Sequence, residues 1–167
     1  HLKDLTEIIE NINNTSISSI SGRYYSMDRD NRWDRTELAY RAIVEGKCVR
    51  EYSNPSKMIE KFYNESLTDE FIPPCISRKY KGFEKNDGFI ITNFRADRVR
   101  QFLTALCDTD FSIFERKRKI QLSKRLGLIQ YSKRLDKILD SVFGSTLVSN
   151  TLGKIISEHG LNQLRIA

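Results

Sequence analysis

Residues 88–107 read GFIITNFRADRVRQFLTALC, and this stretch decides the fold class. Its apolar beginning, residues 88–93, suits a short strand that is buried on both faces. Apolar side chains then recur at helical spacing over 96–107, with no linker between the two patterns. A short apolar strand that leads directly into a helix is typical of α/β domains. We therefore expect a layered α/β domain with a mostly parallel sheet flanked by helices.

The remaining sequence predicts more helices than strands. Apolar spacing predicts helices over 2–12, 34–44, 132–142 and 150–159, and one from Pro55 onward. Local signals support two of their starts, a cap at Asn54 and a capping box of Asp34 with Glu37. Alternating Ile and Ser predict a strand over 17–20, and the apolar residues of 163–167 also resemble a strand. The stretch 68–88 is rich in turn residues. So few strands are unusual for a parallel sheet, and we expect a domain that lacks strands at one or both ends.

The composition excludes several classes of protein. The chain has 167 residues, and this length is enough for one domain over 1–167 with a hydrophobic core. Its residues are 39% hydrophobic and 30% charged, which is too apolar for a disordered chain. It contains no apolar run near the ~20 residues of a membrane span, and acidic residues interrupt its N-terminal apolar pattern, unlike a signal peptide. The three widely spaced cysteines, Cys48, Cys75 and Cys107, are typical of reduced thiols. We expect a cytoplasmic protein.

The positive charge is concentrated in one part of the chain. The net charge is +6, and residues 111–140 account for it, with nine Lys or Arg against three acidic residues. Such a basic region occurs in nucleic-acid-binding and membrane-binding surfaces. The alternative, which we favour, is an ordinary solvated face of a loop and a helix.

Two arginine-rich segments follow predicted strands. Residues 21–35 read SGRYYSMDRDNRWDR, with four arginines, the only tryptophan and no lysine. Residues 93–98 read NFRADR. In open α/β sheets, ligands bind beyond the carboxyl ends of the strands. If the two strands are parallel, both segments lie at that edge.

These segments predict an anion-binding pocket. A guanidinium group donates two parallel hydrogen bonds that match a phosphate or carboxylate, whereas a lysine acts as a point charge. Asp28, Asp30 and Asp97 can hold the guanidinium planes in place, and the start of the helix over 96–107 adds backbone N–H donors. We expect a pocket for a small, multiply charged anion that carries phosphate and carboxylate groups. The alternative is a lattice of ion pairs that only ties loops together.

Other chemical signals are weak. Tyr24, Tyr25, Trp33 and Phe94 could stack on a ligand, but core packing is the better interpretation. His159 suits a helix end, and with only one other histidine, at the N-terminus, no zinc or manganese cluster is expected. The sequence contains no nucleophile motif, P-loop or dinucleotide fingerprint. The chain is expected to bind a substrate without transforming it.

The two arginine-rich segments, about sixty residues apart, resemble the cofactor-independent phosphoglycerate mutase family, as does the end of the chain, residues 153–167. The resemblance covers nearly the whole chain, and residues 116–131 fit less closely. Enzymes of this family have two α/β domains. One resembles alkaline phosphatases, holds two manganese ions and forms a phosphoserine, and the other is inserted into it and binds the phosphoglycerate.

The resemblance implies that this chain is the inserted domain. It then implies that Arg23, Arg29, Arg95 and Arg98 bind phosphoglycerate, with Asp97 in the same site, while Arg32 and Arg35 support their loop. The metal ligands, the serine and the other catalytic groups of the family have no counterpart here. We therefore expect no catalytic residue, no metal site and no activity in this chain alone, and a monomeric protein in which the alkaline-phosphatase-like domain is its partner. The runner-up hypothesis is a nucleic-acid-binding module that uses residues 116–137.

Overall fold

The computed structural model describes residues 1–144, 149–164 and 166. Its strands form two three-stranded sheets. The first has the order β1-β3-β2, with β1 (Ser19–Ile20) antiparallel and β2 (Arg50–Tyr52) parallel to β3 (Cys75–Ser77). The second has the order β4-β5-β6 and is entirely parallel: β4 (Gly88–Ile91), β5 (Lys124–Gly127) and β6 (Asp140–Ser141). The α/β class is confirmed, but the expected single sheet is in fact two small ones.

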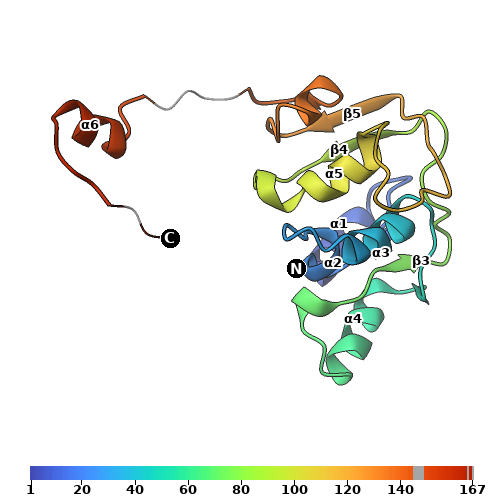
Figure 1. Cartoon of the computed structure of the whole chain (residues 1–167). Helices are drawn as coiled ribbons and strands as arrows, with labels where there is room; N and C mark the ends of the chain where they lie inside the picture. Colours follow the sequence, from blue (N-terminus) through green and yellow to red (C-terminus); the bar gives the residue numbers. More distant parts are fainter. Residues whose placement is uncertain (145–148, 165, 167) are drawn as a thin grey trace.

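The helices pack around and between these sheets (Figure 1). They are α1 (Leu2–Ile9), α2 (Arg23–Ser26), α3 (Trp33–Ile43), α4 (Pro55–Asn64), α5 (Arg100–Cys107) and α6 (Leu152–Glu158). Single 3-10 turns lie at η1 (Asp69–Phe71), η2 (Ala96–Arg98) and η3 (Leu135–Lys137). Helix α6 lies apart from the two sheets (Figure 1). No helix in the described ranges is long and apolar enough to cross a membrane.

Local signals placed some helix ends correctly. The side chain of Asn54 accepts a hydrogen bond from the Lys57 N–H at 2.9 Å, and Pro55 takes the first helical position of α4. Helix α6 ends before Gly160, whose positive φ of 67° suits a helix stop. The predicted capping box was wrong, because Asp34 caps nothing. No side chain caps α3; the N–H of Arg32, the residue just before the helix, donates to the side chain of Asp28 at 2.9 Å.

Several sequence-based predictions were wrong. The helix predicted over 132–142 is a 3-10 turn, η3, followed by the short strand β6. The turn-rich stretch contains β3, and β2 and β5 were missed. The helix predicted over 96–107 is divided into η2 and α5, and the strand-like residues Gln163 and Leu164 form no strand, while 165 and 167 lie outside the described residues.

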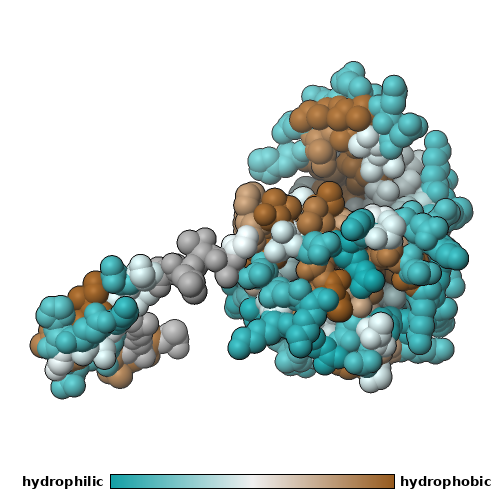
Figure 2. Space-filling model, turned by 90° about the horizontal axis from the view of Figure 1, so that it is seen from above, coloured by the Kyte–Doolittle hydropathy of each residue, from teal (hydrophilic) through white to brown (hydrophobic). Residues whose placement is uncertain are grey.

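Two apolar segments are more exposed than their patterns predicted. Strand β4 is not buried on both faces, because the Ile90 side chain is 63% exposed. Helix α1 is shorter than predicted, and its apolar residues Leu5 and Ile8 remain largely in solvent. Figure 2 shows such hydrophobic side chains as patches on a mostly hydrophilic surface.

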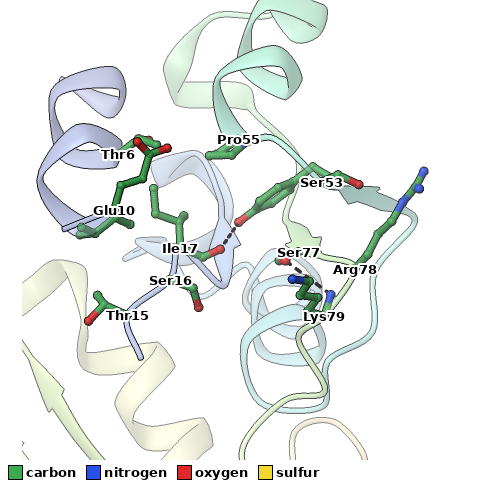
Figure 3. A pocket seen from close by; sticks show the side chains of 12 residues that line it. Thr6, Glu10, Thr15, Ser16, Ile17, Ser53, Pro55, Ser77, Arg78 and Lys79 are labelled. Atoms are coloured by element: carbon green, nitrogen blue, oxygen red, sulfur yellow. Dashed lines mark hydrogen bonds between the residues drawn. The ribbon is translucent and has the colours of Figure 1, made fainter. Parts of the chain in front are cut away.

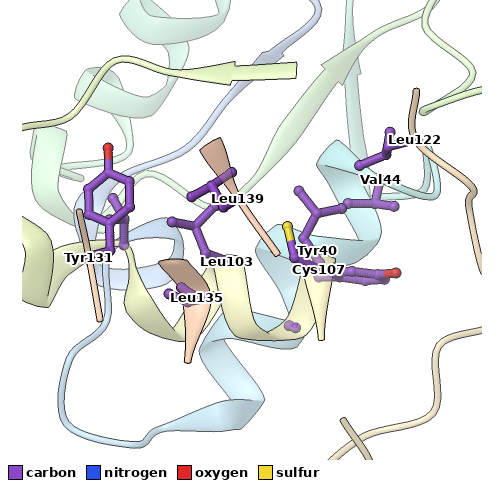
Figure 4. Close-up of a cluster of buried hydrophobic side chains, with 11 residues drawn as sticks. Tyr40, Val44, Leu103, Cys107, Leu122, Tyr131, Leu135 and Leu139 are labelled. Carbon is purple, nitrogen blue, oxygen red and sulfur yellow. The ribbon is translucent and has the colours of Figure 1, made fainter. Parts of the chain in front are cut away.

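Two hydrophobic cores hold the layers together. The larger core joins α3 and α5 to the parallel sheet, and Figure 4 shows its members: Tyr40, Val44, Leu103, Cys107, Leu122, Tyr131, Leu135 and Leu139. The smaller core packs α4 on the mixed sheet through Tyr52, Phe62, Ile72 and Cys75. Each sheet is packed against its own core, so the two small sheets have separate apolar centres.

Candidate functional site

The two arginine-rich segments lie side by side, as expected from the sequence. The guanidinium of Arg29, in the loop after α2, donates to the carboxylate of Asp97 in η2 at 2.9 Å. In the other direction, Arg98 donates to the backbone carbonyl of Met27 at 3.1 Å. These two contacts join residues about 70 positions apart in sequence. They bring Arg23, Arg29, Arg95 and Arg98 to one surface, which we call the arginine cluster.

The reason for this proximity differs from the one expected. Strands β1 and β4, which precede the two segments, belong to different sheets and share no common edge. Instead, α3 packs directly against α5, and each helix carries its preceding arginine-rich loop to the same place. The contact between two helices therefore assembles the cluster.

A buried carboxylate ties the first arginine-rich segment to α5. Asp28 is only 4% exposed. One of its oxygens accepts hydrogen bonds from the backbone N–H groups of Asp30 and Arg32, at 3.1 and 2.9 Å, and from the Gln101 amide at 2.9 Å. Its other oxygen lies 3.4 Å from the Arg35 guanidinium. Asp28 thus fixes the loop that carries Arg29 and ties it to α5.

Gln101 completes this connection. Its side-chain oxygen accepts a hydrogen bond from the Asn31 N–H at 3.1 Å, while its amide nitrogen also reaches the Thr36 hydroxyl at 3.2 Å. Gln101 and Thr36 are both buried, so these bonds are shielded from water. Sequence analysis missed Gln101, because an isolated glutamine in an amphipathic helix gives no signal of a partner 73 residues away.

Asp97 bridges two of the predicted arginines. Its Oδ1 accepts a hydrogen bond from Nε of Arg95 at 2.9 Å, and its Oδ2 accepts the bond from Arg29. The bonds from Arg95 and then Arg29 lower the pKa of Asp97 to about 2. The predicted role of an aspartate in orienting guanidinium planes is confirmed here. Asp28 does the same for Arg35, whereas Asp30 is bonded through its backbone.

A glutamate in η1 holds the first arginine of the cluster. Arg23 donates to Glu70 at 2.8 Å, and this hydrogen bond lowers the pKa of the Glu70 carboxyl. Gly22, just before Arg23, allows the close approach, because a Cβ there would lie 2.2 Å from the Glu70 carbonyl oxygen. Glu70 lies in the turn-rich stretch 68–88 and was not recognisable there as a partner of Arg23.

A buried tyrosine supports the second segment. The Tyr131 hydroxyl, from the loop after β5, donates to the Asn93 carbonyl at 2.7 Å, and the Tyr131 carbonyl accepts from Arg100 at the start of α5. The Asn93 side chain in turn accepts from the Arg95 N–H at 2.7 Å. Tyr131 therefore fixes the turn that presents Arg95.

The aromatic residues near the cluster divide between packing and exposure. Trp33 packs against Phe111 with ring centres 5.4 Å apart, and Arg35 lies over the Tyr24 ring at 3.7 Å. These rings are half-buried and pack against other side chains, outside both hydrophobic cores. Core packing was wrong for Phe94, which is 63% exposed and stacks on Phe143 beside the cluster.

The resulting arrangement can bind an anion. Four arginines and two partly exposed carboxylates, Asp97 and Glu70, share one surface, so the local charge is positive. Each guanidinium has five N–H donors, and the internal contacts leave most of them free. Across the described residues, no group of three His, Cys, Asp or Glu side chains could hold a metal ion. The family resemblance assigns two manganese ions to the other domain, and the described residues offer no ligand set for them.

The basic region over 116–137 is organised differently. Arg116 donates to the Ala105 and Asp108 carbonyls, Arg118 to the Lys81 carbonyl, and Arg134 pairs with Asp108 at 2.6 Å. These arginines brace the loop that follows α5. The arginines of this region therefore bind groups of the protein itself, and its lysines form the solvated face that was expected.

A hollow at the carboxyl ends of β2 and β3 is less suited to a charged ligand. It has a volume of about 430 Å³, and α1, Tyr52 and Ile17 contribute much of its mainly apolar wall. Figure 3 shows the tyrosine hydroxyl bonded to the Ile17 carbonyl, at 2.9 Å, and Arg78 extending away from Ile17. Its polar groups do not converge on one point.

The comparisons with known proteins agree with one another. A family model described as BPG-independent PGAM N-terminus matches residues 1–133. The chain is 45% identical over 167 residues to the 2,3-bisphosphoglycerate-independent phosphoglycerate mutase of Ehrlichia ruminantium (strain Gardel), covering 100% of this chain and 32% of that protein. It is 40% identical over 166 residues to the enzyme of the same name from Legionella pneumophila (strain Philadelphia 1), covering 99% of this chain and 32% of that protein.

A solved structure agrees with these sequences. The chain resembles a crystal structure of Leishmania mexicana phosphoglycerate mutase at low cobalt concentration, with a TM-score of 0.76 and 27% identity over 96% of this chain and 31% of that one. The chain thus spans about a third of the length of the curated relatives it matches. None of these similarities favours a nucleic-acid-binding module.

Proposed function

Because the chain belongs to the family of 2,3-bisphosphoglycerate-independent phosphoglycerate mutases, we propose that the full-length protein interconverts 2-phosphoglycerate and 3-phosphoglycerate in glycolysis. We assign the binding of phosphoglycerate to this chain. The observation that carries the proposal is the assembly of the arginine cluster, in which Arg29 and Asp97 join the two segments at 2.9 Å.

The chemistry of the cluster matches that of the substrate. Phosphoglycerate carries a phosphate and a carboxylate, roughly three negative charges near neutral pH, on a short carbon skeleton. Arg23, Arg29, Arg95 and Arg98 provide forked donors of opposite charge, and Asp97 and Glu70 hold three of them in place. Arginine side chains that are already oriented lose less conformational entropy when they bind the anion.

The proposed role is to hold the substrate while its phosphoryl group changes position. Phosphoryl transfer depends mainly on positioning and on neutralising charge. The guanidinium groups would retain the glycerate after the phosphoryl group leaves one hydroxyl and until it returns to the other. Asp97 would act within the site by fixing Arg29 and Arg95, since a carboxylate itself repels the substrate.

The bond-making groups belong elsewhere in this proposal. A serine that becomes phosphorylated and two manganese ions would lie in an alkaline-phosphatase-like domain outside this chain, and closure of that domain would exclude water. Residues 1–167 form the substrate-binding domain, inactive alone, of a monomeric cytoplasmic enzyme.

Substitution of Arg95 in the full-length enzyme tests the proposal. Arg95→Ala removes charge-assisted hydrogen bonds to substrate, each worth about 1.5–3 kcal/mol, so kcat/KM should fall by about two orders of magnitude or more. The matched control is Arg78→Ala, because Arg78 is exposed and lies outside the cluster. It should leave kcat/KM within about twofold. Equal activity of Arg95→Ala and the parent enzyme would refute the assigned role.

A further inference from the structure

The basic region contains a cavity that the proposed function does not use. The cavity has a volume of about 290 Å³ and lies at the C-terminal end of α5, whereas the arginine cluster lies at the other end of that helix. Its inner wall includes Tyr40, Cys107 and Leu122, which Figure 4 shows together at the edge of the larger core. Its outer wall comes from the loop over 116–125.

Positive charges outnumber negative charges around this cavity. Arg116, Lys119 and Arg125 line it, and among its described lining residues only Asp108 is acidic. The Asp108 carboxylate is already bonded to Arg134 at 2.6 Å. The end of α5 adds the equivalent of about half a negative charge, which is much less than the cations supply.

Hydrogen bonds leave much of this positive charge available. Arg116 donates to carbonyls, at 2.9 Å to that of Asp108, and carbonyls carry no net charge. Arg125 makes one long bond of 3.4 Å to the Ile138 carbonyl. Lys119 is exposed, and its ammonium has no bonded partner within the described chain.

The positive charges also affect the pKa values of two buried side chains beside the cavity, Tyr40 and Cys107. Burial raises the pKa of Tyr40 to about 12, and the charge of Arg116 opposes that rise. Burial likewise raises the pKa of Cys107 to about 11, against the charge of Arg125. Both cations therefore act on the interior of the cavity.

We propose that this cavity is a second anion site, which binds a small phosphate anion such as inorganic phosphate or pyrophosphate. Lys119 and Arg125 would donate to the phosphate oxygens, with the exposed Gln121 side chain as a further donor. The volume is several times the ~30 Å³ that one water occupies in the liquid, enough for such an anion. A long nucleic acid would instead contact the lysines outside the cavity as well.

Two neighbouring lysines allow a charge-matched test. Lys119 lines the cavity, whereas the exposed Lys117 side chain does not. Lys119→Met and Lys117→Met remove the same charge from the same loop. Binding of radiolabelled pyrophosphate is measured by equilibrium dialysis at about 0.15 M salt, where long-range effects of exposed charges are screened. An Arg95→Ala background weakens pyrophosphate binding by the arginine cluster.

The proposal predicts that Lys119→Met weakens binding about tenfold or more, while Lys117→Met changes it less than twofold. Arg125→Gln should match Lys119→Met. Equal losses of pyrophosphate binding in Lys119→Met and Lys117→Met would mean diffuse binding and would overturn the proposal. Displacement of pyrophosphate by an unlabelled DNA oligonucleotide, with equal dependence on the two lysines, would overturn it in the same way. Absence of pyrophosphate binding at millimolar concentration in the Arg95→Ala background would overturn it as well. Loss of mutase activity by Arg95→Ala tests the proposed function separately.

Discussion

The arginine cluster and the basic region use the same residue type in opposite ways. In the cluster, Arg23 and Arg29 are held by carboxylates, and their guanidinium groups remain partly exposed. In the basic region, Arg116 and Arg118 donate to backbone carbonyls and brace a loop. A carboxylate orients a guanidinium whose other donors still face solvent. Carbonyls occupy donors of Arg116 and Arg118, so local charge density alone does not identify which cations can bind a ligand.

The two regions also differ in what lies beneath them. The loop that carries Arg29 rests on the buried Asp28, which bonds backbone N–H groups of its own segment and the Gln101 side chain of α5. The basic loop covers a cavity, lined in part by Tyr40 and Leu122. One region is therefore preorganised by a polar network, and the other by apolar packing with arginines at its edge.

The largest expected effect in this comparison is that of removing the buried carboxylate. Asp28→Ala leaves the Gln101 amide and the Arg35 guanidinium without their acceptor, and two backbone N–H groups lose theirs. Breaking such a buried interaction costs about 3 kcal/mol or more. The free energy of unfolding, measured by urea denaturation, should fall by about that amount.

Asp30→Ala is the matched control for this change. Asp30 is exposed and contributes its backbone N–H to Asp28, which the substitution retains. Its cost should stay within about 0.5 kcal/mol. If the two aspartate variants were equally stable, the arginine loop would not depend on the buried network, and the contrast between the regions would disappear.

A smaller effect is expected in the basic region. Arg116→Ala removes hydrogen bonds to the Ala105 and Asp108 carbonyls at the end of α5 and should cost about 1–2 kcal/mol in the same measurement. Lys117→Ala, one residue away and exposed, should cost less than about 0.5 kcal/mol. Equal costs for the two variants would contradict a bracing role of the arginine.

The sequence predicted those features that depend on neighbouring residues. Asn54 and Pro55 determine the start of α4 together, and the apolar run of β4 leads directly toward α5. The arginine-rich segments were recognisable as candidates for anion binding because their residue types carry the chemistry. The family resemblance, based on the same residues, is confirmed by the match over residues 1–133.

Features that depend on distant partners could not be predicted. Strand β2 contains Arg50 and Glu51 and shows no apolar pattern, so its conformation comes from pairing with β3. Over 132–142, Leu135 and Leu139 are buried, but their spacing fits a 3-10 turn and a strand as well as a helix. Asp28 finds Gln101 only because α3 and α5 pack together.

The smallest expected effect is the acid titration of the bridging carboxylate. Hydrogen bonds from Arg95 and Arg29 lower the pKa of Asp97 from 3.8 to about 2 in the folded protein. A lowered folded pKa contributes stability above the unfolded value, and this contribution is lost as the pH falls toward 2. The carboxyl carbon of Asp97, followed by NMR, should therefore titrate with a midpoint near pH 2. Arg95→Gln should move that midpoint up toward 3.8, whereas Arg78→Gln, outside the cluster, should leave it unchanged. A midpoint near 3.8 in the parent protein would show that Asp97 is not held by the arginines in solution, and the cluster would then be no better organised than the lysines of the basic region.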